Sequence, residues 1–98
     1  MYRQGDILLA VCTALPRTVQ KQSDRVLAEG EATGHTHQVM DEAFVWVDTD
    51  GTKYVEVYGS QARLVHEEHG PITLPGPAVY RVIRQRQYVA GEVRYVAD

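Results

Sequence analysis

The stretch FVWVDTDGTKYVEVY, residues 44–58, contains two runs of alternating apolar residues joined by a short polar link. Within this link, Asp50-Gly51 is a residue pair that adopts positive backbone φ angles at low cost, as tight β-hairpin turns require. Alternation with a period of two is typical of strands that bury one face. We therefore predict a hairpin with strands at Phe44–Asp48 and Tyr54–Tyr58.

The rest of the chain repeats this pattern in short apolar runs bounded by Gly, Pro and Asp, and no window keeps a helical period over three turns. The segment PITLPGP, residues 71–77, cannot donate freely to a strand ladder and is expected at an edge or in a loop. Gly59-Ser60 predicts a turn. Further strands are expected at Ile7–Cys12, Arg25–Gly30 and His35–Met40, and within the C-terminal runs YRVIRQRQYV and VRYVA. The sequence thus predicts an all-β fold of seven to nine short strands, as a single small barrel or a two-sheet sandwich.

Length and composition indicate one folded domain over residues 1–98. The hydrophobic content of 44% and the charged content of 23% are near the averages for soluble globular proteins. A formal net charge of −3 at pH 7 does not favour a general polyanion binder. The single cysteine, Cys12, excludes an intramolecular disulfide and a zinc ribbon. We find neither a signal peptide nor a membrane span, and expect a cytoplasmic protein.

The four histidines fall in two pairs, His35 and His37 in GHTH and His66 and His69 in HEEH. Strand residues two apart point to the same face, roughly 6.5–7 Å apart, so the first two imidazoles can converge on one cation. The second pair would complete the coordination of a divalent metal if the fold brings the two segments together. We therefore predict a histidine cluster that binds zinc, iron, nickel or manganese.

The residues around these histidines add candidate catalytic groups to the predicted metal site. Glu67 and Glu68 lie between the second pair and are candidate catalytic acids or bases for metal-assisted hydrolysis. Gly34, directly before His35, predicts a local positive φ or a close backbone approach. The alternative interpretation is that the histidines are ordinary polar residues that hydrogen-bond to the backbone.

The C-terminal run YRVIRQRQY is a second candidate site. In one extended strand, a single face would carry Tyr80, Val82, Arg84, Arg86 and Tyr88. Two arginines between two tyrosines could stack bases and neutralise phosphates. They could equally form a solvated face that pairs with the acidic middle of the chain.

These strands support a second functional hypothesis, from a different class. It is a non-catalytic interaction module that binds a protein or nucleic-acid partner, with nucleic acid disfavoured by the negative net charge. An uncovered edge strand would also allow the chain to associate with itself.

Four longer motifs occur in order along the chain: RQGDILL, VLAEGEATGHTHQV, LVHEEHGPITLP and YRVIRQRQY. Together they resemble a family of small, uncharacterised bacterial and phage-associated β-proteins whose pattern includes QGD, EGExTGHxH and LVHEEHxPIxLPxGxY. The resemblance spans most of the chain and implies no assigned activity. The chain departs from the pattern at LPGPAVY, where one extra residue and a moved proline alter the turn.

The stretch GHTHQVMDE is more weakly similar to the first metal motif of the cupin barrels. This resemblance implies a metal site in which His35, His37 and Glu42 are ligands. The second cupin motif would place a histidine after the proline-containing turn, where this chain has Tyr80. The similarity therefore covers half of a cupin site.

Overall fold

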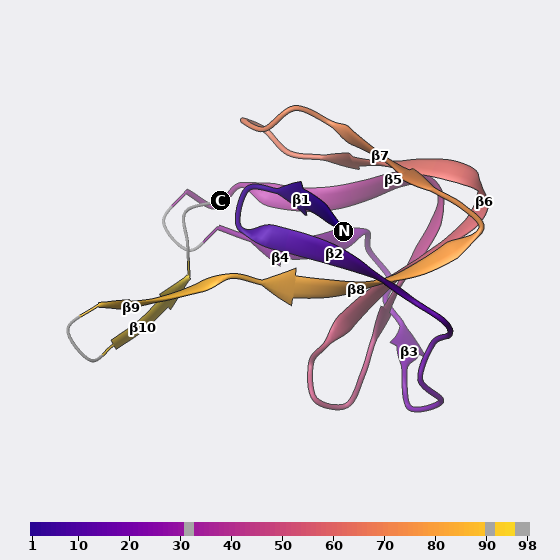
Figure 1. The fold of residues 1–98 in the computed structure, drawn as a ribbon, viewed down its shortest axis with the longest axis horizontal. Coiled ribbons are helices and arrows are strands. Elements are labelled where there is room, and N and C mark those ends of the chain that lie inside the picture. Colours follow the sequence, from indigo (N-terminus) through magenta and orange to yellow (C-terminus); the bar gives the residue numbers. More distant parts are fainter. Residues whose placement is uncertain (31–32, 90–91, 96–98) are drawn as a thin grey trace.

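The computed structural model is an all-β structure that describes residues 1–30, 33–89 and 92–95, with the backbone alone for residues 86–89 and 92–95. Its described residues form ten strands and no helix (Figure 1). The strands are β1 Tyr2–Gln4, β2 Ile7–Cys12, β3 Gln20–Lys21, β4 Val26–Glu29, β5 Thr36–Val47, β6 Lys53–Val65, β7 Ile72–Pro75, β8 Ala78–Arg84, β9 Arg86–Val89 and β10 Glu92–Tyr95.

The predicted hairpin around Asp50-Gly51 is confirmed and is longer than the alternation indicated. Trp46 of β5 pairs with Tyr54 of β6, and Gly51 in the turn has a φ of +87°. The two strands expected at 35–40 and 44–48 form one continuous strand. The turn expected at Gly59-Ser60 is wrong, because β6 runs through both residues.

The β5–β6 hairpin is irregular at its middle. Between the pairs Asp41–Ala62 and Ala43–Val57, one residue intervenes on β5 and four on β6, so the three extra residues of the bulge lie on β6. The register shifts between Asp41 and Ala43, and Asp41 has a φ of +71°. The Asp41 carboxylate accepts a hydrogen bond from Nε of Arg63 on the partner strand, at 2.9 Å. A Cβ atom at Gly59 would collide with the side chain of Glu42, so a larger residue beside the bulge would require Glu42 to move. Bulges bend strands and increase their twist, which lets one hairpin belong to both halves of a folded sheet.

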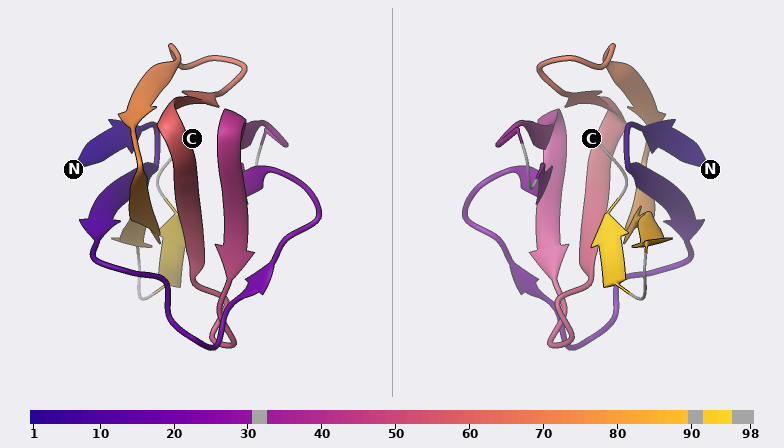
Figure 2. Two further views of the ribbon diagram at one scale, coloured as in Figure 1. Left: turned by 90° about the vertical axis from the view of Figure 1, so that its right-hand side faces the viewer. Right: turned by 90° about the vertical axis from the view of Figure 1, so that its left-hand side faces the viewer.

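The halves of the sheet share this hairpin and extend to either side of it (Figure 2). Near the turn, β5 pairs with β3 on one side, and β6 pairs with β8 on the other. β8 pairs in turn with β2, and β2 with β1. Beyond the bulge, they pair with β4 and β7. Both halves contribute to one apolar core: Ile7, Leu9, Leu27, Val39, Ala43, Val45, Val55, Val57, Ala62, Leu64, Leu74 and Tyr80.

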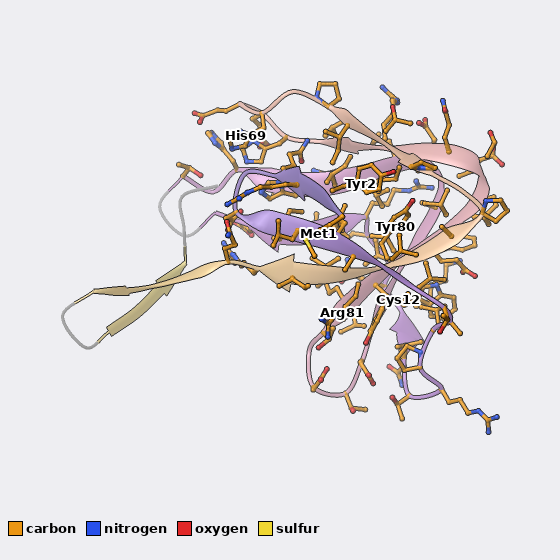
Figure 3. The ribbon with its side chains drawn as sticks, viewed as in Figure 1. Met1, Tyr2, Cys12, His69, Tyr80 and Arg81 are labelled. Atoms are coloured by element: carbon orange, nitrogen blue, oxygen red, sulfur yellow. The ribbon has the colours of Figure 1, made fainter. Side chains whose placement is uncertain are left out.

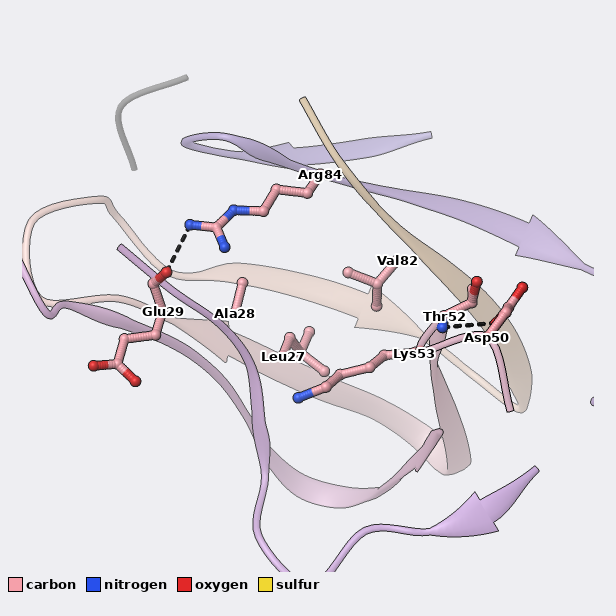
Figure 4. Close-up of a pocket in the computed structure, with 9 residues that line it drawn as sticks. Leu27, Ala28, Glu29, Asp50, Thr52, Lys53, Val82 and Arg84 are labelled. Atoms are coloured by element: carbon pink, nitrogen blue, oxygen red, sulfur yellow. Dashed lines mark hydrogen bonds between the residues drawn. The ribbon is translucent and has the colours of Figure 1, made fainter. Parts of the chain in front are cut away.

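The sheet is not closed into a barrel, so the barrel alternative of our prediction is wrong and the sandwich alternative is allowed. In the described structure β4 pairs with β5 alone, and an open pocket of about 520 Å³ separates it from β8 (Figure 4). Leu27 from β4 and Val82 from β8 line this pocket, together with Lys53 and Arg84. The cationic side chains donate to carbonyl oxygens of β4, Lys53 to Val26 and Arg84 to Glu29. These side chains connect β6 and β8 to β4 across the pocket.

The Pro-rich segment behaves as predicted. β7 pairs only with β6 among the described strands, which makes it an edge strand. The Tyr80 hydroxyl donates to the carbonyl oxygen of Pro75, and the Tyr80 ring makes an edge contact with Tyr2 at 5.8 Å between centroids (Figure 3). The side chains of β1 and β8, which both pair with β2, are therefore in direct contact.

Candidate metal centre

The two histidine pairs meet in space, which is the geometric condition for the predicted metal site. The ring centroid of His66 lies 5.5 Å from that of His35, 4.4 Å from that of His37 and 4.6 Å from that of His69. The cause is the pairing of β5 with β6, in which Gln38 lies opposite Val65. Residues just before Gln38 therefore lie beside residues just after Val65, and the four rings form the histidine cluster.

A tight turn presents His35 at the start of β5. Gly34 has a φ of +72°, as predicted, and the His35 carbonyl accepts a hydrogen bond from the Gly30 amide at 2.7 Å. The His35 amide donates to the hydroxyl of Thr33 at 3.1 Å. The His35 side chain keeps 26% of its surface exposed, and its Nδ1 lies 3.7 Å from a carboxylate oxygen of Glu68.

His66 is held by the loop that follows β6. Its Nδ1 accepts hydrogen bonds from the backbone amides of Glu68, at 3.0 Å, and of His69, at 3.3 Å. A neutral imidazole accepts at one nitrogen and carries its proton on the other. Nδ1 is therefore the nitrogen with the lone pair, and Nε2 carries the proton.

Glu67 ties the loop to the first residue of β5. One carboxylate oxygen accepts the backbone amide of Thr36 at 2.9 Å, and the other accepts the Thr36 hydroxyl at 3.3 Å. Hydrogen bonds from its own backbone amide and from Thr36 lower the pKa of the Glu67 carboxyl. Glu67 is therefore an ionised carboxylate at neutral pH, with lone pairs left for a further ligand.

Three of these side chains lie at a spacing close to that of a metal site. One ligand atom each from His35, His66 and Glu67 falls within 4.8 Å of the other two. A tetrahedral Zn²⁺ with ligands at about 2.0–2.1 Å separates its donor atoms by about 3.3 Å. An approach of up to about 1.5 Å would thus convert this group into a coordination sphere.

His37 occupies a different position from the other three histidines, because its ring is buried and hydrogen-bonded on both sides. Gln4 donates its amide N–H groups to the carbonyls of Leu64 and Gly70, each at 3.0 Å, so its oxygen accepts from His37 Nδ1 at 2.9 Å. His37 Nε2 lies 3.0 Å from Oδ1 of Asp6. The predicted role of His37 as a ligand does not fit this arrangement, since neither ring nitrogen is available.

Asp6 connects His37 of β5 to Arg84 of β8. Its second oxygen accepts Nε of Arg84 at 2.8 Å, and the Asp6 side chain is fully buried. Burial lowers the pKa of His37, while the hydrogen bond to Asp6 acts in the opposite direction. Sequence reasoning missed Gln4 and Asp6, although both lie in the QGD motif, because polar residues beside a turn give no local sign of burial.

The predicted ligand Glu42 lies elsewhere. It is at the bulge, about 20 Å along β5 from His35 at the usual rise per residue, and its side chain packs over Gly59. The cupin-like ligand set of His35, His37 and Glu42 therefore does not assemble. Glu68 is exposed and faces His35 without joining the three-donor group, so its predicted catalytic role stays a prediction.

The face predicted for partner binding is not a continuous surface. Tyr80 is 2% exposed, Val82 packs against the core, and Arg84 is hydrogen-bonded to Asp6. Arg86 and Tyr88 belong to β9, whose side chains lie outside the described part of the structure. Partner binding by the C-terminal strands stays a prediction.

The described residues contain no helix long and apolar enough to cross a membrane, and cytoplasmic localisation stays a prediction.

Comparison with known proteins identifies the family of the chain and nothing further. No curated protein and no solved structure is significantly similar to the chain. The sequence model of one family, described as a domain of unknown function (DUF8820), matches residues 3–85. Because this match covers most of the sequence, including both histidine pairs, the chain belongs to the DUF8820 family.

Proposed function

We propose that the protein is a small metal-binding β domain in which His35, His66 and Glu67 hold one divalent cation. The observation that carries this proposal is the convergence of three donor atoms within 4.8 Å, from segments about thirty residues apart in the chain. The cation would link the start of β5 to the loop after β6.

The chemistry of the donors favours zinc among the cations considered. Two imidazoles and one carboxylate are a donor set found in zinc sites, whereas magnesium and calcium favour oxygen donors. Imidazole also suits iron and nickel, so these remain competitors, and manganese is the weakest candidate because it favours oxygen donors. Glu67 adds a negative charge that offsets part of the charge of the cation.

Metal binding would change the loop that carries His66. The lone pair of its Nδ1 already accepts two backbone amides, so a cation bound there must displace them. Two such hydrogen bonds contribute about 1–3 kcal/mol together. Structural zinc sites bind with apparent free energies of about 10–16 kcal/mol, which is enough to offset this loss.

The proposal is tested by calorimetric titration of Zn²⁺ into the untagged, chelator-treated protein. We expect one ion per chain, and we expect His35→Ala and Glu67→Gln each to weaken binding by at least about tenfold. Glu42→Gln is the matched control, because it removes an exposed carboxylate at the bulge of the hairpin, outside the histidine cluster. Equal binding by all four proteins, or no binding by the wild type, would overturn the proposal.

Metal-assisted hydrolysis depends on the fourth coordination position. Catalytic zinc sites have three protein ligands and one water, whereas structural sites have four protein ligands. A water in the fourth position would make Glu68, near His35, the candidate general base. The chemistry of the site is thus decided by which group occupies that position.

A further inference from the structure

We propose that His69 is the fourth ligand of this metal site, which makes the site structural and closed to water. The inference rests on the proposed function above and assigns its coordination number. Of the four histidines, His37 is fixed by Gln4 and Asp6. His69 is the remaining imidazole of the cluster.

The first observation is that a buried nitrogen of His69, Nε2, has no hydrogen-bond partner among the described residues. A buried polar atom without a partner lowers the stability of the folded state, and such atoms require an explanation, a bound ion among them. A cation at Nε2 would satisfy this nitrogen.

The second observation is the position of the ring. The His69 ring lies 4.6 Å from that of His66, centroid to centroid, in the loop between β6 and β7 (Figure 3). It is also nearly parallel to the His37 ring, with 6.3 Å between centroids and 9° between planes. His69 is therefore next to a proposed ligand and belongs to the same group of rings.

The third observation is a hydrogen bond that metal binding would release. The backbone amide of His69 donates to Nδ1 of His66 at 3.3 Å. A cation that takes this lone pair frees the His69 amide, so the backbone at residue 69 can shift. His69 lies outside the group of three donors within 4.8 Å, and this released loop is what would allow its ring to join them.

The resulting site would contain three imidazoles and one carboxylate. Four protein ligands satisfy a tetrahedral Zn²⁺ or Co²⁺ and leave no position for a reactive water. The cation would then fasten the loop of residues 66–70 to the start of β5. Its effect would be an increase in stability, not a rate of hydrolysis.

The test uses Co²⁺ bound to the full-length, untagged protein, because tetrahedral Co²⁺ absorbs visible light much more strongly than Co²⁺ with five or six ligands. We expect the wild type to give an intense tetrahedral spectrum. His69→Ala and His69→Gln should weaken the spectrum and lower Co²⁺ affinity by more than about tenfold. Added imidazole should restore the spectrum of His69→Ala, since it can fill the vacated position. Glu42→Gln, a change at an exposed carboxylate outside the histidine cluster, is the matched control and should leave both readouts unchanged.

The outcomes separate this inference from the proposed function. If His69→Ala and His69→Gln keep the wild-type affinity and spectrum while His35→Ala loses them, the site exists and His69 is not a ligand. If the wild type binds no Co²⁺ or Zn²⁺, the proposed function fails and this inference fails with it. Should both His69 variants fail to fold, long-range ¹H–¹⁵N NMR of the wild-type rings decides. A metal-induced shift of the His69 Nε2 resonance supports the inference, and an unshifted resonance overturns it.

Discussion

Replacement of Asp6 tests the buried network that supports the histidine cluster. Asp6 is fully buried, with one carboxylate oxygen 3.0 Å from His37 Nε2 and the other 2.8 Å from Arg84 Nε. Asp6→Ala leaves both partners without their acceptor. Asp6→Asn has almost the same shape, and its amide can donate to a neutral His37 ring while its oxygen still accepts from Arg84.

The magnitudes follow from these contacts. Removing one partner of a buried ion pair costs about 3–5 kcal/mol, which we expect for Asp6→Ala. Asp6→Asn keeps a hydrogen bond to each partner but removes the carboxylate charge from both, at a loss of about 1 kcal/mol each, or about 2 kcal/mol together. Asp6→Asn is therefore expected to be the more stable variant by about 1–3 kcal/mol.

Urea unfolding of the metal-free protein at neutral pH measures both changes, with equal m-values showing that the unfolded states are comparable. Arg81→Ala, at an exposed position of the same strand as Arg84, is the control and should change the free energy of unfolding by less than about 0.5 kcal/mol. A loss below about 1 kcal/mol for Asp6→Ala, or equal losses for both Asp6 variants, would refute the network described above.

Three further predictions concern the site and its scaffold. Gly76→Ala should destabilise the fold by about 1–3 kcal/mol in urea unfolding, because its Cβ would collide with the Gly59 carbonyl and with Val57; a neutral effect would show that this approach is not close. The lowered pKa of Glu67 stabilises the fold above the unfolded value near pH 4.5 and ceases to do so as the pH falls through the folded pKa. The difference in unfolding free energy between the wild type and Glu67→Gln should therefore be constant above about pH 5.5 and shrink below pH 4.5; a difference that grows on acidification contradicts this sign. Zinc should shift the amide NMR signals of Glu68 and His69, which lose their acceptor on His66, and unchanged signals would mean that Nδ1 does not bind metal.

Local patterns predicted those parts of the fold that local conformation determines. The Asp50-Gly51 turn was identified because few residue pairs adopt its φ angles, and the edge position of β7 followed from its prolines. Gly59-Ser60 was misread as a turn, since both residues lie within β6 at the bulge, where Gly59 packs beside the side chain of Glu42 on the neighbouring strand. A contact between strands leaves no mark in the sequence around the glycine itself.

The histidine cluster shows the same limit. Near the turn, paired residues of β5 and β6 have numbers that sum to 100, as Val47 with Lys53, whereas beyond the bulge they sum to 103, as Gln38 with Val65. This shift of three residues moves His37 from alignment with residue 63 to alignment with His66. It arises because β6 has three more residues than β5 between these two parts of the ladder, and Asp41, opposite them, gives a weaker signal for a positive φ than a glycine would. The sequence thus predicted which residue types form the site, but it did not predict the register of β5 and β6 that brings them together.

The central claim is that His35, His66 and Glu67 hold one cation, and it is tested most directly by anomalous X-ray diffraction at the zinc absorption edge. Crystals of the untagged protein grown with one equivalent of Zn²⁺ would be used. We predict a single strong anomalous peak at about 2.0–2.1 Å from a nitrogen of His35 and from Nδ1 of His66, with a Glu67 oxygen at a similar distance. Anomalous density only elsewhere on the molecule, with these three side chains unchanged, would contradict the claim.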